Sequence, residues 1–149
     1  MTNYVRKLAW LSAKPDGSKK TRREQFTELN ENHSSLSLPD LSESHAGYII
    51  VLLHECGLMS SNGMGPCPLS WTEIHNWLSV TKRDLPTFEI NLIKHLSNEY
   101  VSEYYLASDI NRPDPHKSVD YKSPDRRKAV SDSIRAVMTN IKEDLRQRR

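Results

Sequence analysis

Residues 41–57, LSESHAGYIIVLLHECG, carry the most regular apolar pattern of the chain. Their large side chains recur three and four residues apart, which is the period of one face of an α-helix. Gly57 follows at the position where a left-handed C-terminal cap is expected. The stretch therefore predicts a buried central helix, whose inward face consists of Leu41, His45, Tyr48, Ile49, Leu52, Leu53 and Cys56.

Two shorter helices are predicted on the N-terminal side. The first covers about residues 3–13 and stops at a Pro–Asp–Gly turn. Thr21 and Glu24 have the spacing of a capping box and predict the start of a second helix. The Ser-rich stretch 33–40 is typical of a linker.

A Gly- and Pro-rich loop, residues 59–68, follows the central helix. Ser70 and Glu73 form a second predicted capping box, and the helix that they open fades near Lys82. The longest predicted helix begins at Pro86 and ends at about residue 108. A basic terminal helix is predicted after residue 123, and no segment shows the alternation of a strand.

These elements predict an all-α fold, a small bundle of about five to six helices with a Gly/Pro-rich loop and a basic C-terminal helix. We divide the chain into a basic N-terminal helical arm with a linker (1–40), a helical core domain (41–110), and a linker with the basic C-terminal helix (111–149). The predicted core consists of Ile49, Leu52, Leu53, Ile74, Leu78, Leu92 and Leu96.

Composition indicates one core and no membrane span. The chain has 149 residues, an apolar fraction of 36% and a mean hydropathy of -0.69. The longest apolar run, residues 48–53, is too short to cross a bilayer, and the N-terminus lacks a signal-peptide core. Two cysteines are too few for a secreted disulfide scaffold, so we expect thiols and a cytoplasmic protein.

Charge is segregated along the chain. Residues 1–30, 31–110 and 111–149 have net charges of +4, -7 and +5, which together give the formal charge of +2. The basic ends could fold onto the acidic middle or reach an acidic partner, or the charges could simply form solvated faces.

No residue pattern predicts catalysis. A metal site is the first alternative, because His54, Cys56, Cys67 and His75 are close in sequence, but their spacing does not match structural zinc sites. Nucleophile elbows and phosphate-binding Gly loops are also absent from the sequence. We therefore expect no enzyme activity, no cofactor and no metal.

The aromatic residues of the fourth and fifth predicted helices suggest a surface for a protein partner. Trp71 and Trp77 lie six residues apart, about 240° around a helix, so one of them should stay near the surface. We place the partner groove at Trp77; the candidate residues are Trp71, Ile74, Trp77, Leu92, Tyr100 and Tyr104. Alternatively, these residues fill the core.

The basic clusters also raise nucleic-acid binding. Lys19–Arg23 and Arg126–Arg149 contain the clustered cations that contact phosphates. Acidic residues surround the two helices that could form a helix-turn-helix, among them Glu73, Asp84, Glu89, Glu99 and Glu103. Nucleic acid is therefore the less favoured partner.

Residues 63–77, GMGPCPLSWTEIHNW, resemble the tail assembly chaperones of long-tailed bacteriophages. That family has a Gly-rich stretch, then Pro, an apolar residue, an aromatic, Glu–Ile and another aromatic. The runs 85–90 and 96–101 resemble the next helix of the family, and the resemblance covers about residues 41–115. The basic terminal helix has no counterpart in the family pattern.

The resemblance implies a protein that binds the apolar helical tape measure protein, keeps it soluble and helps tail tube subunits to polymerise around it. It implies no catalysis and a location in the cytoplasm of the infected bacterial host. Self-association is a further option. The alternatives are a structural minor tail protein retained in the virion and a DNA-binding regulator.

Overall fold

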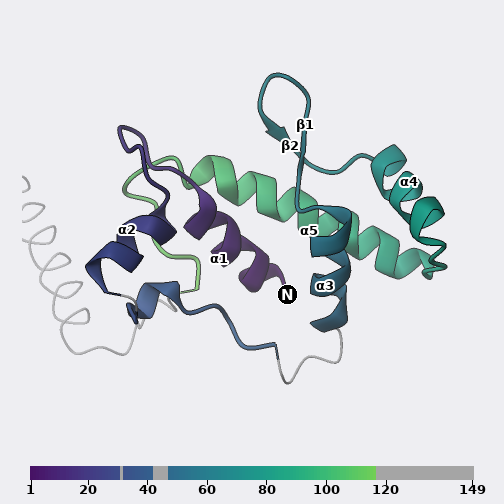
Figure 1. Ribbon diagram of the computed structural model, residues 1–149, viewed down its shortest axis with the longest axis horizontal. Helices are drawn as coiled ribbons and strands as arrows, with labels where there is room; N and C mark the ends of the chain where they lie inside the picture. Colours follow the sequence, from purple (N-terminus) through teal and green to yellow (C-terminus); the bar gives the residue numbers. More distant parts are fainter. Residues whose placement is uncertain (31, 42–46, 117–149) are drawn as a thin grey trace, which may run out of the picture. The chain divides into compact units, whose positions relative to one another are not determined.

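The computed structural model describes residues 1–30, 32–41 and 47–116, and these form a mainly helical unit (Figure 1). The predicted all-α fold is confirmed. The basic C-terminal helix predicted after residue 123 lies outside the described residues. The elements are α1 (Thr2–Ser12), α2 (Arg22–Leu29), the 3-10 helix η1 (Ser34–Leu36), α3 (Gly47–Cys56), β1 (Ser60–Ser61), β2 (Pro66–Cys67), α4 (Trp71–Thr81) and α5 (Thr87–Leu106).

Local capping signals set several helix ends. Both predicted capping boxes are present: Thr21 with Glu24 opens α2, and Ser70 with Glu73 opens α4. Gly57 follows α3 with a φ of +106°, which a residue without Cβ adopts at little cost. The N-terminus of the central helix differs from the prediction, because Leu41 is not helical and α3 is described from Gly47.

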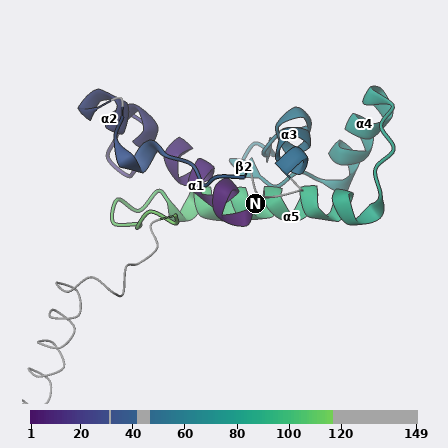
Figure 2. The ribbon, with the colours of Figure 1, turned by 90° about the horizontal axis from the view of Figure 1, so that it is seen from below.

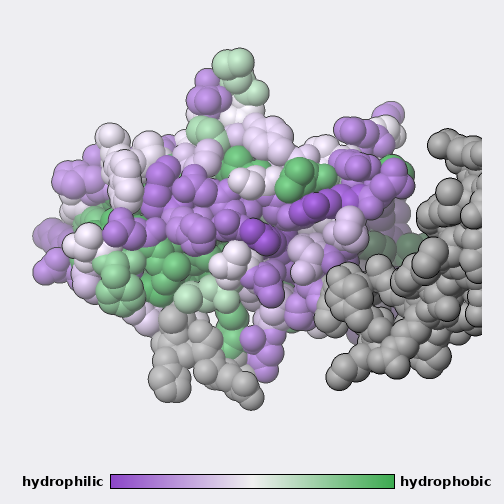
Figure 3. All heavy atoms as spheres, turned by 180° about the vertical axis from the view of Figure 1, so that it is seen from behind, coloured by the Kyte–Doolittle hydropathy of each residue, from purple (hydrophilic) through white to green (hydrophobic). Residues whose placement is uncertain are grey.

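Helix α5 is the base on which α1, α3 and α4 pack. Figure 2 shows α1, α3 and α4 on one side of this helix, and α1 and α3 make the most extensive contacts with it. Its opposite side carries the exposed residues Asn91, His95 and Ser102. Figure 3 views that side and shows a hydrophilic band with an apolar patch beside it.

The main core differs from the prediction in including α1. Val5, Leu8 and Ala9 join the apolar side chains of α3 and α5 in one cluster. Of the predicted core residues, Leu78 and Leu92 lie only partly buried at the edge of this cluster. The predicted residues that are fully within it are Ile49, Leu52, Leu53, Ile74 and Leu96.

The predicted N-terminal arm is part of the same compact unit as the core, which runs from Met1 to His116. The Lys7 ammonium is buried and lies 2.5 Å from the Asp114 carboxylate. The Trp10 indole N–H donates a hydrogen bond of 3.0 Å to the Arg112 carbonyl. These contacts, together with the apolar face of α1, join the predicted arm to the helices that follow it.

A small hairpin interrupts the loop for which no strand was predicted. β1 pairs with β2 antiparallel, with Ser60 opposite Cys67. The buried Ser97 hydroxyl joins the two ends of this segment: it donates to the Leu58 carbonyl and accepts from the Leu69 N–H, each at 2.9 Å. Strands of two residues are too short to show alternation in the sequence.

Candidate protein-binding surfaces

The six predicted partner-binding residues do not form one surface. Ile74 and Tyr100 are buried in the main core. Trp77, Leu92 and Tyr104 are partly buried against that core. Trp71 alone among the six has a largely exposed side chain, at 54%.

Tyr100 and Tyr104 belong to the packing between α1 and α5. Their rings stack with centroids 6.4 Å apart, and Tyr104 contacts both the main core and a second cluster around Trp10. Burial raises the pKa of Tyr100, and a hydrogen bond with Ser12 opposes the rise. Tyr100 is buried in this packing and Tyr104 is partly buried, so Tyr100 offers no surface to a partner beside Trp77.

The two tryptophans of α4 lie in different environments, as their spacing predicts. The exposed one is Trp71, whereas the sequence prediction placed the partner anchor at Trp77. The Trp77 ring packs on the core, and the Arg83 guanidinium lies 5.6 Å from its centroid. Trp77 therefore contributes to folding as well as to any surface beside it.

Arg83 connects the flank of Trp77 to helix α3. Its guanidinium lies 2.7 Å from the Glu55 carboxylate, and both side chains are partly exposed. Glu55 follows Val51 by four residues and Tyr48 by seven, so the three lie on one face of α3. We call this region the α3–α4 surface, defined by Tyr48, Val51, Glu55, Trp77, Val80 and Arg83.

Two apolar side chains of the α3–α4 surface are largely exposed. The exposed fractions are 57% for Val51 and 82% for Val80. The Tyr48 hydroxyl donates a hydrogen bond to the buried Glu89 carboxylate, which extends the surface to the first turn of α5. There Phe88 is 64% exposed. Accessible apolar side chains rimmed by an ion pair are typical of surfaces that bind other proteins.

The sequence does not predict a role for Val51, Val80 or the Glu55–Arg83 pair. The predicted inward face of α3 includes Tyr48, which is 47% exposed, and leaves out Val51. Its spacing from Tyr48 and Glu55 was a signal that it belongs to the outward face. The ion pair joins residues 28 positions apart, so no local pattern indicates it.

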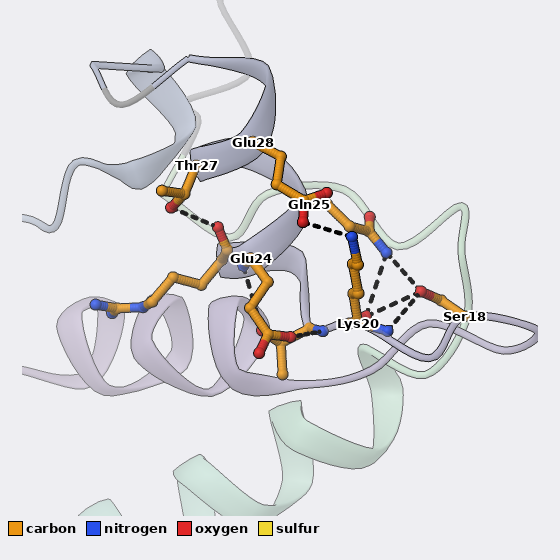
Figure 4. Close-up of polar contacts among 8 residues, drawn as sticks. Ser18, Lys20, Glu24, Gln25, Thr27 and Glu28 are labelled. Atoms are coloured by element: carbon orange, nitrogen blue, oxygen red, sulfur yellow. Dashed lines mark hydrogen bonds and ion pairs between the residues drawn. The ribbon is translucent and has the colours of Figure 1, made fainter.

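The basic cluster at Lys19–Arg23 is less available than its sequence suggests. The Arg22 side chain is buried and donates to the carbonyls of Ala107 and Asp109, the second at 2.7 Å. Burial lowers the Arg22 pKa, and the charges of Asp109 and Glu103 oppose this effect. Figure 4 shows that Lys20, which precedes α2, pairs with Glu28 in the last turn of that helix.

The His/Cys residues considered as metal ligands do not form a site in the part of the chain that the structure describes. No group of three or more His, Cys, Asp or Glu side chains there could hold a metal ion. Burial raises the pKa of the Cys56 thiol, and the nearby Glu73 charge adds to the rise. Cys56 is therefore a poor nucleophile at neutral pH.

Comparison with protein-family models, with curated proteins and with solved structures finds no match to this chain. Among the described helices, none is long and apolar enough to cross a membrane. The described surfaces and the resemblance of residues 63–77 are therefore the features that indicate a function.

Proposed function

We propose that this chain is a non-catalytic protein that binds an apolar helical partner through the α3–α4 surface. The observation that carries the proposal is the exposure of Val51 on α3 and of Val80 on α4, with the Glu55–Arg83 ion pair joining α3 to the segment that follows α4. When a partner covers such side chains, the free energy falls by about 25 cal/mol for each Å² of apolar area removed from water. An amphipathic helix can supply matching groups at helical spacing.

In its specific form, the proposal is a bacteriophage tail assembly chaperone whose partner is the tape measure protein. The resemblance of residues 63–77, which include β2 and most of α4, supports this form. A chaperone of this kind must cover long apolar helices without changing them chemically, and exposed apolar groups on helices suit that task. A minor tail protein retained in the virion remains an alternative that would use the same surface.

A DNA-binding regulator has less support. Phosphate contacts need cations that can reach outward, and Arg22 is directed into the unit while Lys20 is paired with Glu28. In the N-terminal cluster, Lys19 and Arg23 are exposed. Outside the Lys20–Glu28 ion pair, the N-terminal cluster therefore has two exposed cations, which make a small site for contacting phosphates.

The proposal is tested with a tape measure fragment from the same genome. Val51→Asp and Val80→Asp each place a charge on the surface where the partner would remove water. We expect each variant to stay folded and to bind the fragment about tenfold or more weakly, and the fragment to precipitate. Titration calorimetry and a co-expression solubility assay measure the two effects.

Two matched controls separate this surface from general loss of apolar area. Leu29→Asp places the same charge on α2, where the side chain is 74% exposed, and should bind as the wild type does. Trp71→Ala tests the other edge of α4 and should also leave binding unchanged. Equal loss in all four variants would contradict the α3–α4 surface, and a wild-type chain that does not bind the fragment would contradict the chaperone assignment.

A further inference from the structure

The hairpin presents a reactive dipeptide at its tip. Asn62–Gly63 is the single Asn–Gly pair in the sequence, and both residues are exposed. Space around the glycine is open, because a Cβ placed there would meet no atom within 4 Å. Water and hydroxide therefore reach this peptide bond freely.

The base of the hairpin is held on two helices, which keeps the tip turned outward. The Ser60 hydroxyl donates to the Glu73 carboxylate of α4. The Tyr105 hydroxyl of α5 donates to the Pro66 carbonyl at 2.6 Å. Between these anchors the Asn62 N–H closes the loop on the Gly65 carbonyl at 3.4 Å.

The turn favours attack of the glycine nitrogen on the asparagine side chain. The Met64 N–H donates to Asn62 Oδ1 at 3.1 Å, which draws electron density from the side-chain carbonyl. The same donor would stabilise the negative charge that this oxygen acquires during attack. Within the described residues the Gly63 N–H makes no hydrogen bond, so its proton is open to removal by hydroxide.

We propose that Asn62–Gly63 is a site of spontaneous deamidation through a cyclic imide. The Gly63 nitrogen loses its proton to hydroxide and forms a bond to Asn62 Cγ, and the side-chain nitrogen takes up a proton and leaves as ammonia. Water then opens the five-membered ring. Cleavage of the new bond gives aspartate at position 62, and cleavage of the original peptide bond gives isoaspartate.

The fold restrains three other pairs that could follow the same chemistry. Asp16–Gly17 can form the same imide, but the Asp16 N–H bonds the Ser108 carbonyl at 2.8 Å and fixes that turn to the end of α5. Asn76 and Asn98 lie inside α4 and α5, where the next backbone N–H is engaged in the helix. Deamidation at the hairpin tip should therefore precede deamidation at Asn76 and Asn98.

The product changes both charge and backbone length. One additional carboxylate lowers the formal net charge from +2 to +1. Isoaspartate also inserts a methylene group into the main chain of the turn. The anchors at Ser60 and Pro66 lie outside the altered bond, so the helical unit should keep its fold.

The experiment incubates the folded full-length protein in mildly alkaline buffer and follows each asparagine by peptide mass spectrometry. We expect deamidation at position 62 before Asn76 or Asn98 reacts, with both isomers present and an unchanged circular dichroism spectrum. Asn62→Gln should abolish the early product, and Gly63→Ala should slow it, because a Cβ hinders the attacking nitrogen. A parallel sample unfolded in urea shows what the bond does without the fold.

Two results would overturn the proposal. One is an Asn62 that stays intact in the folded protein while it converts in urea, which would mean that the turn protects the bond. The other is deamidation at Asn98 or Asn76 at the same rate as at Asn62, which would mean that the hairpin confers no selectivity.

Discussion

At the scale of single residues, polar groups in the interior connect segments that are distant in sequence. Ser97 has no exposed surface, yet its hydroxyl satisfies one backbone group on each side of the hairpin. Arg22 does the same for two carbonyls at the end of α5. Buried backbone groups cost free energy when they lose a partner, so these side chains fix positions that apolar contacts alone would leave loose.

Ser97→Ala should destabilise the protein by about 1–3 kcal/mol, because it leaves the Leu69 N–H without its buried acceptor. Urea unfolding measures the loss, and hydrogen exchange should show faster exchange over residues 58–69. Ser102→Ala is the matched control, since Ser102 is exposed on the same helix and its removal should change stability by less than about 0.5 kcal/mol. Equal effects from the two variants would contradict the role of Ser97.

At the scale of elements, one carboxylate joins the hairpin to helix α4. Glu73 caps the first turn of α4 through Ser70 and also accepts the Ser60 hydroxyl. The Ser60 hydrogen bond is the largest cause of a lowered Glu73 pKa, and the bonds from Ser70 follow. Because α4 has a single fully buried residue, Ile74, these polar contacts are a large part of what holds it in place.

Stability should therefore fall in acid partly through Glu73. Its folded pKa lies below the ordinary value of 4.5, so the stabilisation is present above that pH and is lost as the pH falls through the folded pKa. We expect the melting temperature of Glu73→Gln to fall less steeply with acid than that of the wild type below about pH 5. Ser60→Ala, which removes the main cause of the shift, should give an intermediate slope; parallel curves for all three proteins would refute this account.

At the scale of the whole unit, α5 brings the N-terminal and C-terminal halves into one core. Val5 and Leu8 of α1 pack in the same cluster as Ile93 and Leu96 of α5. Lys7 of α1 also forms a buried ion pair with Asp114, which follows the C-terminal end of α5. Removing one partner of a buried ion pair lowers the free energy of unfolding by about 3–5 kcal/mol. The stability of each half of the unit therefore depends on the other.

Truncation distinguishes this arrangement from a core with a separate arm. Residues 1–116 should fold cooperatively, because they comprise the compact unit. Residues 41–116 should lose most of their helicity, since the α1-facing side of α5 would be exposed to water. Circular dichroism during thermal unfolding measures both, and a cooperative transition in the shorter chain would support the predicted boundary at residue 40.

The sequence by itself determined the features that depend on near neighbours. Apolar spacing identified the helices, two capping boxes placed the starts of α2 and α4, and the six-residue separation of Trp71 and Trp77 indicated that one of them stays exposed. The physical reason is that helical hydrogen bonds and caps join residues within about four positions of each other.

The tertiary structure alone decided which faces meet. It placed α1 in the core, covered Tyr100, buried Arg22 and joined Glu55 to Arg83. It also paired β1 with β2 and tied their segment to Ser97. Burial and ion pairing depend on which distant segment fills the adjacent space, and hydrophobic attraction has no direction that a local pattern could encode.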